Sequence, residues 1–447
     1  MFDREDTNMT LTAKGTQTTG SRRDFMKIAT VGTAGAALGG AATPAIADAH
    51  TDARYDAGLE LLNSLGADTS LEAISPDLAK LYVQHAYGDV ISRDVLDPMT
   101  REAVAIASLM NSGNYTQPIL EHINAYLNLG GKPEALLEMC FIAIAVMGFP
   151  SAINTTGKIR TTLAERGIEI EPVPEATDDG TERYLMGARY MIANTEGGIQ
   201  ELQDLTEENP AFAKILASYA YGEIMTRDGL DARTKTLTTL AMLATQGNAQ
   251  SWIRDTTLGG LRQNVSRDDI VESMLQLTVH RGYPSAIVAL FQVKEVFDGL
   301  DAGTLSLDEA DGEIPEVTLA TREARFAQGE LELSKTTGAA GAAVVSSFAD
   351  MAPDIGNHIM EYLYGDVFSR PEISLRDREI STVSALAATG TLTSQGPMRV
   401  HFNASLTAGL TKIEIQEVLL NMVPFVGFPK VQRALEIAQE VFDEREM

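Results

Sequence analysis

Cysteine is almost absent from this chain: Cys140 is the single one among 447 residues, so no disulfide can form within one copy. It lies in an apolar stretch with helical spacing, where a buried and inert thiol is the usual outcome. The sequence also lacks a glycine-rich phosphate loop after a strand and a cysteine–histidine cluster with metal-ligand spacing. These absences predict a protein that uses no cofactor and holds no metal ion.

Basic residues and long apolar runs are also scarce. The chain has 35 Lys and Arg against 62 Asp and Glu, a formal net charge of −27. Such a charge repels nucleic acid and anionic lipid, so we exclude both as partners. After the N-terminal region, no segment is apolar for long enough to span a bilayer, which predicts a protein that does not insert into membranes.

The first 47 residues have the order of a twin-arginine export signal. Arg22 and Arg23 stand in Ser-Arg-Arg-Asp-Phe-Met-Lys, a weakly apolar Ala/Gly stretch follows, and Ala47 closes Pro-Ala-Ile-Ala, a sequence with small residues at the cleavage positions. The alternative is a disordered tail that happens to contain two arginines. We expect cleavage after Ala47, a mature chain that begins at Asp48, and a soluble protein in the periplasm.

Three stretches of the chain are nearly the same. Each contains Tyr-Gly, then an acid, then an arginine four residues after the acid, which we call the Tyr-Gly motif; Gly-aromatic-Pro follows each copy at a similar distance. The motif glycines are Gly88, Gly222 and Gly365, spaced 134 and 143 residues apart. A period this long indicates a duplicated domain, because solenoid repeats are much shorter. We predict a signal at 1–47 and three repeats, at 48–170, 181–298 and 317–447.

Each repeat is predicted to be all α. Apolar residues recur at helical spacing, and the helix boundaries carry the expected residues. Asp97 is placed to cap a central helix with Pro98 at its first position, and Asp231 and Ser374 stand at the matching positions. One small bundle cannot bury its apolar faces alone. We therefore expect the repeats to pack as a pseudo-trimer, and the whole chain to be a monomer or a dimer.

Two groups of residues are candidates for chemistry, and the first lies in the Tyr-Gly motif. Its acid and arginine are four residues apart, so they can share one face of a helix. On composition alone a structural salt bridge is the favoured explanation. The three pairs are Asp89 with Arg93, Glu223 with Arg227, and Asp366 with Arg370.

The second group joins a histidine to a carboxylate. In the first repeat His122 begins one helix and faces the preceding helix, where Glu102 lies; His401 and Glu379 repeat this in the third. A histidine beside a carboxylate is the minimal general acid–base pair, and histidine titrates near neutral pH. The alternative is a helix-end histidine that bonds a carbonyl. The matching residues of the middle repeat are Thr236 and Thr256.

In their order, Arg-Tyr-x-x-Gly, Tyr-Ala-Tyr-Gly-Glu-Ile-Met-Thr-Arg, the helix histidine and Gly-Phe-Pro resemble the carboxymuconolactone decarboxylase family. The resemblance covers nearly the whole mature chain. It implies small helical units that assemble around sites between helices, and a cofactor-independent decarboxylase or lyase for a carboxylated lactone or similar small acid. It makes His122 and His401 proton donors beside Glu102 and Glu379. It also matches the acids and arginines of the Tyr-Gly motifs to substrate-binding residues.

A sister branch of that family, the alkylhydroperoxidases, uses Cys-x-x-Cys four residues before the histidine. Here those positions hold Tyr115 and Pro118 in the first repeat, and Ser394 and Pro397 in the third, which excludes a dithiol peroxidase. The leading interpretation is an exported decarboxylase-like enzyme that binds a small carboxylate or lactone. The alternative is a non-catalytic binding or assembly protein that has kept the fold.

Overall fold

The computed structural model describes residues 45–65, 70–110, 116–173, 180–308, 312–390 and 392–447. The chain divides into two compact parts, Met1–His50 and Thr51–Met447, and the helices discussed below lie in the second from Thr51 onward. The predicted export signal falls outside the described residues, except for its last three. Over the described ranges all regular structure is helical and no β-strand occurs, which confirms the all-α prediction.

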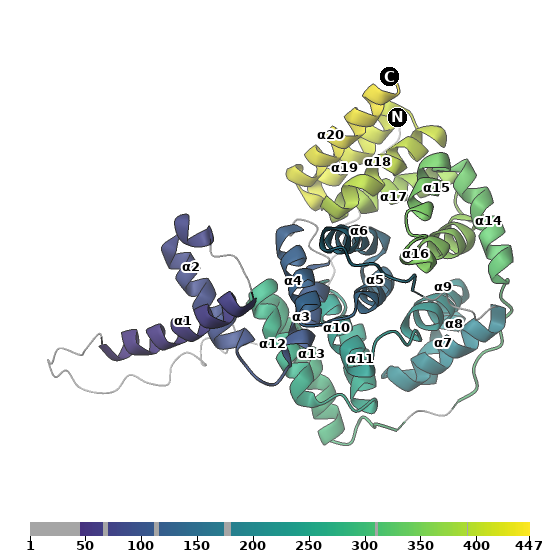
Figure 1. Ribbon diagram of the computed structural model, residues 1–447. Helices are drawn as coiled ribbons and strands as arrows, with labels where there is room; N and C mark the ends of the chain where they lie inside the picture. Colours follow the sequence, from purple (N-terminus) through teal and green to yellow (C-terminus); the bar gives the residue numbers. More distant parts are fainter. Residues whose placement is uncertain (1–44, 66–69, 111–115, 174–179, 309–311, 391) are drawn as a thin grey trace, which may run out of the picture. The chain divides into compact units, whose positions relative to one another are not determined.

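The helices fall into three sets with the same order, which correspond to the three repeats (Figure 1). The first contains α1 (Ala45–Leu65), η1 (Ser70–Ala73), α2 (Pro76–Tyr82), η2 (Val83–Ile91), α3 (Pro98–Leu109), α4 (Thr116–Asn128), α5 (Pro133–Met147) and α6 (Phe149–Arg166). The second contains α7 (Gly180–Asn194), α8 (Gly198–Glu208), α9 (Pro210–Ile215), η3 (Leu216–Met225), α10 (Ala232–Ala244), α11 (Gln250–Arg262), α12 (Arg267–His280) and α13 (Tyr283–Asp301). The third contains α14 (Arg322–Lys335), α15 (Gly338–Ser346), α16 (Pro353–His358), η4 (Ile359–Phe368), α17 (Leu375–Thr389), α18 (Leu392–Thr407), α19 (Lys412–Val426) and α20 (Phe428–Glu444).

The predicted caps set the boundaries of the central helices α3, α10 and α17. The side chains of Asp97, Asp231 and Ser374 each accept a hydrogen bond from the backbone N–H three residues later. Before the last helix of each repeat stands a glycine with a φ between +80° and +84°, a conformation that strains other residues. These glycines are those of the Gly-aromatic-Pro segments, and their prolines occupy the first turn of α6, α13 and α20.

The tyrosine, glycine and acid of the Tyr-Gly motif lie in a π-helical segment in each repeat, η2, η3 and η4, and the first helix of the repeat packs against it. The contact is between backbones, because glycine faces glycine. In the second repeat a Cβ atom on Gly187 would lie 1.7 Å from the carbonyl oxygen of Ala217, and one on Gly222 would lie 2.3 Å from that of Arg183. Glycine is therefore required on both helices.

The first and second repeats pack on each other reciprocally. Helix α3 contacts its counterpart, α10. Helices α3 and η2 of the first repeat contact α12 of the second, and α10 and η3 of the second repeat contact α5 of the first. Each contact is matched by the same contact with the two repeats exchanged, which defines an approximate twofold axis. The interior residues of α3 and α10 are consequently buried almost without exception.

The third repeat joins the other two differently. Helix α18 contacts α6 of the first repeat, and Arg160 of α6 binds Asp350. Charged groups that include residues of α14 and α16 link the third repeat to the second. There Arg325 donates to Glu223 at 2.8 Å, and Arg227 donates to Asp354 at 2.9 Å. His358 is buried at this junction, and burial lowers its pKa to about 4. All three repeats pack within one chain, but the twofold contact joins only the first two, and α17–α20 keep a separate apolar core.

Cys140 is fully buried in α5, as the sequence indicated, and burial raises the pKa of its thiol to about 12. None of the described helices combines the length and the apolar character needed to cross a bilayer.

Candidate active site

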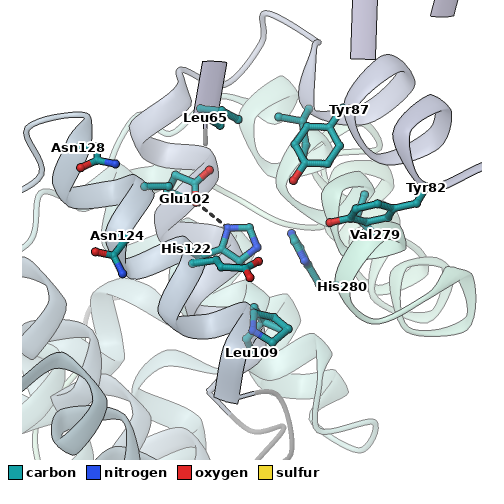
Figure 2. Close-up of a pocket in the computed structure, with 14 residues that line it drawn as sticks. Leu65, Tyr82, Tyr87, Glu102, Leu109, His122, Asn124, Asn128, Val279 and His280 are labelled. Carbon is teal, nitrogen blue, oxygen red and sulfur yellow. Dashed lines mark hydrogen bonds and ion pairs between the residues drawn. The ribbon is translucent and has the colours of Figure 1, made fainter. Parts of the chain in front are cut away.

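A cavity of about 520 Å³ lies beside His122 in the first repeat (Figure 2). Helices α3 and α4 and the segment α2–η2 supply most of its wall, and the end of α12, from the second repeat, closes one side. Its size is within the usual range for small-molecule sites. The lining residues are Leu65, Tyr82, Tyr87, Ile91, Glu102, Leu109, Pro118, Glu121, His122, Asn124, Ala125, Asn128, Val279 and His280.

His122 and Glu102 meet at this cavity. The Nδ1 atom of His122 lies 2.6 Å from Oε2 of Glu102, and Figure 2 shows this contact as a dashed line. Glu102 is only 5% exposed because α3 is a central helix, whereas the His122 side chain is 18% exposed at the wall. A carboxylate at Nδ1 accepts the Nδ1 proton and orients the ring. Nε2 is then the nitrogen that can exchange a proton with a bound molecule.

His280 is a second histidine in the cavity, and the sequence analysis missed it. Its ring lies edge to face against that of His122, with 4.9 Å between the ring centroids. Burial, and then the nearness of His122, lowers the pKa of His280 well below its usual range, so this ring is neutral. Its Nε2 atom is buried with no hydrogen-bond partner among the described residues. No internal comparison marks it, because Val146 and Phe425 occupy the matching positions.

The rest of the polar wall consists of neutral donors and one further carboxylate, Glu121. Arg166 donates to the Oδ1 atoms of Asn124 and Asn128 at 2.9 Å each, which turns both amide nitrogens to other partners. Burial raises the pKa of both Tyr82 and Tyr87, so their hydroxyls stay protonated and can donate. No arginine is among the described residues that line the cavity.

The third repeat holds the same pair in a different setting. The Nδ1 atom of His401 lies 3.0 Å from Oε2 of Glu379, and Glu379 is fully buried. The ring of Phe368 is the aromatic neighbour of His401, at a centroid distance of 6.3 Å. The histidine and carboxylate of the first and third repeats are thus held alike, and in the first site α12 of another repeat supplies part of the wall.

The middle repeat has lost the space as well as the histidine. Thr236 and Thr256 line a cavity of about 30 Å³, which holds about one water molecule. Aromatic rings fill the remainder: Tyr221 stacks on Trp252 with 5.6 Å between ring centroids, and the tilted ring of Tyr190 lies 5.9 Å away. This site has no room for a substrate.

The acids of the Tyr-Gly motifs contact the first helix of their own repeat. Asp89 pairs with Arg54 of α1, Glu223 with Arg183 of α7, and Asp366 with Arg325 of α14. These ion pairs flank the glycine contact described above, and they hold the two helices together. None of the three acids lines the cavity at His122.

The arginines of the Tyr-Gly motifs reach other partners. Arg93 donates to Glu272 of α12 at 2.8 Å and Arg227 to Glu138 of α5 at 2.9 Å, in both cases across the twofold contact. Arg370 contacts the nearby Glu372 at 3.2 Å. The arginines follow a π-helical segment, whose wider turn does not align residues four apart as an α-helix does. Their described contacts are structural, and no motif arginine lines the cavity.

Comparison with known proteins agrees with this architecture. The model of the carboxymuconolactone decarboxylase family matches residues 210–295 and 353–440, in the second and third repeats. The 4-carboxymuconolactone decarboxylase of Acinetobacter baylyi is 32% identical over 93 residues, which cover 21% of this chain and 67% of that protein. The chain belongs to the carboxymuconolactone decarboxylase family.

Two other relatives also match part of this chain. An uncharacterised 15.0 kDa protein from the nqo9–nqo10 intergenic region of Paracoccus denitrificans is 34% identical over 96 residues, 22% of this chain and 71% of that protein. The nitrosuccinic acid decarboxylase npaB of Metarhizium robertsii is 25% identical over 136 residues, 29% of this chain and 93% of that protein.

Within the described residues, no group of three or more His, Cys, Asp or Glu side chains is placed to hold a metal ion.

Proposed function

We propose that the cavity at His122 is the active site of a cofactor-independent decarboxylase or lyase that acts on a carboxylated lactone or a similar small acid. The observation that carries this proposal is the His122–Glu102 contact of 2.6 Å at the wall of a cavity of about 520 Å³. Two relatives named as decarboxylases, for 4-carboxymuconolactone and for nitrosuccinic acid, support the reaction type. The proposal extends to His401 with Glu379 in the third repeat.

The reaction requires a proton donor aimed at carbon. When the bond to the carboxylate breaks, carbon dioxide leaves and the electron pair stays on the adjacent carbon as an enolate-like carbanion. Protonated His122 donates its Nε2 proton to that carbon, and water restores the proton afterwards. Glu102 stabilises the imidazolium before the transfer and keeps the ring in place after it.

Substrate binding is assigned to the neutral donors of the wall together with protonated His122. The hydroxyls of Tyr82 and Tyr87 and the amides of Asn124 and Asn128 can donate to carboxylate and lactone oxygens. His280 is neutral, so it adds no competing positive charge and presents its ring against His122. The motif acids and arginines, which the family resemblance offered for substrate binding, are given a structural role in this proposal.

The test is to incubate the purified chain in D₂O with a panel of carboxylated lactones, nitro-substituted diacids and simple unsaturated acids. We expect release of carbon dioxide from at least one acid, with one deuterium on the carbon that lost the carboxylate. The panel without protein gives the background rate. Binding of one acid with no release from any member would instead support the non-catalytic binding protein.

We also propose that residues 1–47 direct export through the twin-arginine pathway, because paired arginines, an apolar stretch and a cleavage sequence occur there in order. Replacing Arg22 and Arg23 with lysine should abolish recovery of the protein from the periplasm, since a translocase that recognises paired arginines does not accept lysines. Cell fractionation measures this result. Undiminished periplasmic recovery of the double variant would exclude the pathway.

A further inference from the structure

The contact between the first and second repeats is built from a repeated pair of opposite charges. Arg93 of the first repeat binds Glu272 of the second, and Arg227 of the second binds Glu138 of the first. Glu138 and Glu272 occupy the same position on α5 and α12, and both are buried. Each repeat therefore offers one arginine and one carboxylate to an identical arrangement on its neighbour, as in an isologous interface.

The third repeat carries the same two residues without this partner. Glu417 of α19 stands at the position of Glu138 and Glu272, but it is exposed and has no hydrogen bond or ion pair within the described residues. Arg370 stands at the position of Arg93 and Arg227, and its ion pair is with the exposed Glu372, two residues away. The charges of the interface are present, and the facing repeat is missing.

The surface around these charges exposes positions whose counterparts are buried in the contact between the first two repeats. On α17, Ser381 and Ala385 are exposed, whereas their counterparts on α3, Val104 and Ser108, are fully buried where α3 meets α10. On α19, the large apolar side chains that are exposed are Ile413, Leu420 and Phe425, at 69%, 49% and 82%. A cluster of exposed apolar residues beside charged ones is typical of an interaction site.

The counterpart of Leu420 shows what such a position does when it is paired. Phe141 of α5 is fully buried, and the guanidinium of Arg227 from the second repeat lies 3.9 Å from the centre of its ring. If a third repeat faced another third repeat in the same way, Leu420 of one would lie under Arg370 of the other. One chain contains a single third repeat, so this arginine must come from another copy.

A facing third repeat would also contribute a side chain to the site at His401. In the first repeat, the ring of His280 from the facing repeat lies 4.9 Å from His122. Phe425 occupies the position of His280 on α19, and in one copy of the chain it is 82% exposed. A facing third repeat would place its Phe425 against His401, in the way that His280 is placed against His122.

We propose that two copies of this chain associate through their third repeats about a twofold axis. Arg370 of each copy binds Glu417 of the other, α17 packs on α17, and Phe425 of each copy covers His401 of the other. The assembly contains six repeats, in which every Tyr-Gly motif arginine has a carboxylate across a twofold contact. The association does not depend on the proposed reaction. The role of Phe425 at His401 rests on the proposed function.

Charge reversal tests the pairing directly. The wild-type chain should have the mass of two chains by light scattering, and R370E and E417R should each raise the dissociation constant at least tenfold, because each places like charges in contact twice. An equimolar mixture of the two variants should restore the dimer, since every contact then joins opposite charges again. R267E, which disrupts the exposed ion pair with Asp301 in the second repeat, is the matched control and should leave the mass unchanged.

A tryptophan at position 425 reports the covered site. In an F425W chain the new indole should be shielded in the dimer, and adding E417R should shift its emission to longer wavelength; Trp252 is the constant background. A wild-type chain that keeps the mass of one chain at every concentration would overturn the proposal. So would a dimer that survives both reversals, or a variant mixture that stays dissociated while circular dichroism shows folded chains.

Discussion

Replacing both His122 and His401 with alanine should lower turnover on the chain's substrate by about 10²–10⁴-fold, which is the usual contribution of a positioned general acid. Each single replacement should remove only part of the activity, because the first and third repeats each hold a histidine bonded to a buried glutamate. The double replacement removes both of these histidines. Rates are measured as carbon dioxide release from the acid that the screen identifies.

The fold should survive the double replacement, which separates a catalytic loss from a structural one. The side chains of His122 and His401 are 18% and 12% exposed, so alanine replaces partly exposed side chains and leaves no closed cavity in the core. The helical circular dichroism spectrum and the unfolding midpoint are the checks.

Thr256→Ala is the matched control in the middle repeat. Thr256 occupies the histidine position but lines a cavity of about 30 Å³, so its replacement should leave turnover unchanged. If the double histidine variant kept most of its turnover, the histidines would be structural. The proton would then have to come from elsewhere, and the proposed mechanism would be wrong.

Gly187→Ala should lower the free energy of unfolding by about 3 kcal/mol or more, a large effect for the addition of one methyl group. The new Cβ atom would lie 1.7 Å from the carbonyl oxygen of Ala217 and 2.6 Å from the amide nitrogen of Gly222. Both obstacles are backbone atoms, which cannot move aside as a side-chain end can. The contact between α7 and η3 must therefore open, and with it the geometry of the Arg183–Glu223 ion pair.

Urea unfolding followed by circular dichroism measures this loss, and Gly157→Ala is the control. Gly157 is an exposed glycine within α6, and a Cβ atom there would meet nothing within 4 Å. Alanine at that position should raise the stability by up to about 1 kcal/mol, because alanine favours the helix. Equal effects of the two substitutions would show that the glycine contact is not what holds the helices together.

Local features of this protein could be predicted from its sequence because each depends on neighbours close along the chain. Asp97, Asp231 and Ser374 cap their helices as expected, since a cap needs only the next three residues. The glycines before α6, α13 and α20 adopt the positive φ that this residue permits. The facing of His122 and Glu102 was also predictable, because consecutive helices of one repeat lie side by side.

Contacts between repeats could not be predicted, because sequence spacing does not show which helix faces meet. Arg93 and Asp89 lie four residues apart, yet Arg93 binds Glu272, 179 residues away, and Asp89 binds Arg54. His280 reaches the first repeat's cavity from the second repeat, so no pattern within either repeat marks it.

The sequence alone determined the helical class, the three copies of the Tyr-Gly motif and the histidine–carboxylate pairs. The tertiary structure alone decided that the middle site is filled by stacked rings, that the first two repeats face each other about a twofold axis, and that the third is left without such a neighbour. The physical reason is that caps and helix periodicity act over a few residues, whereas the burial of a face depends on what the rest of the chain packs against it.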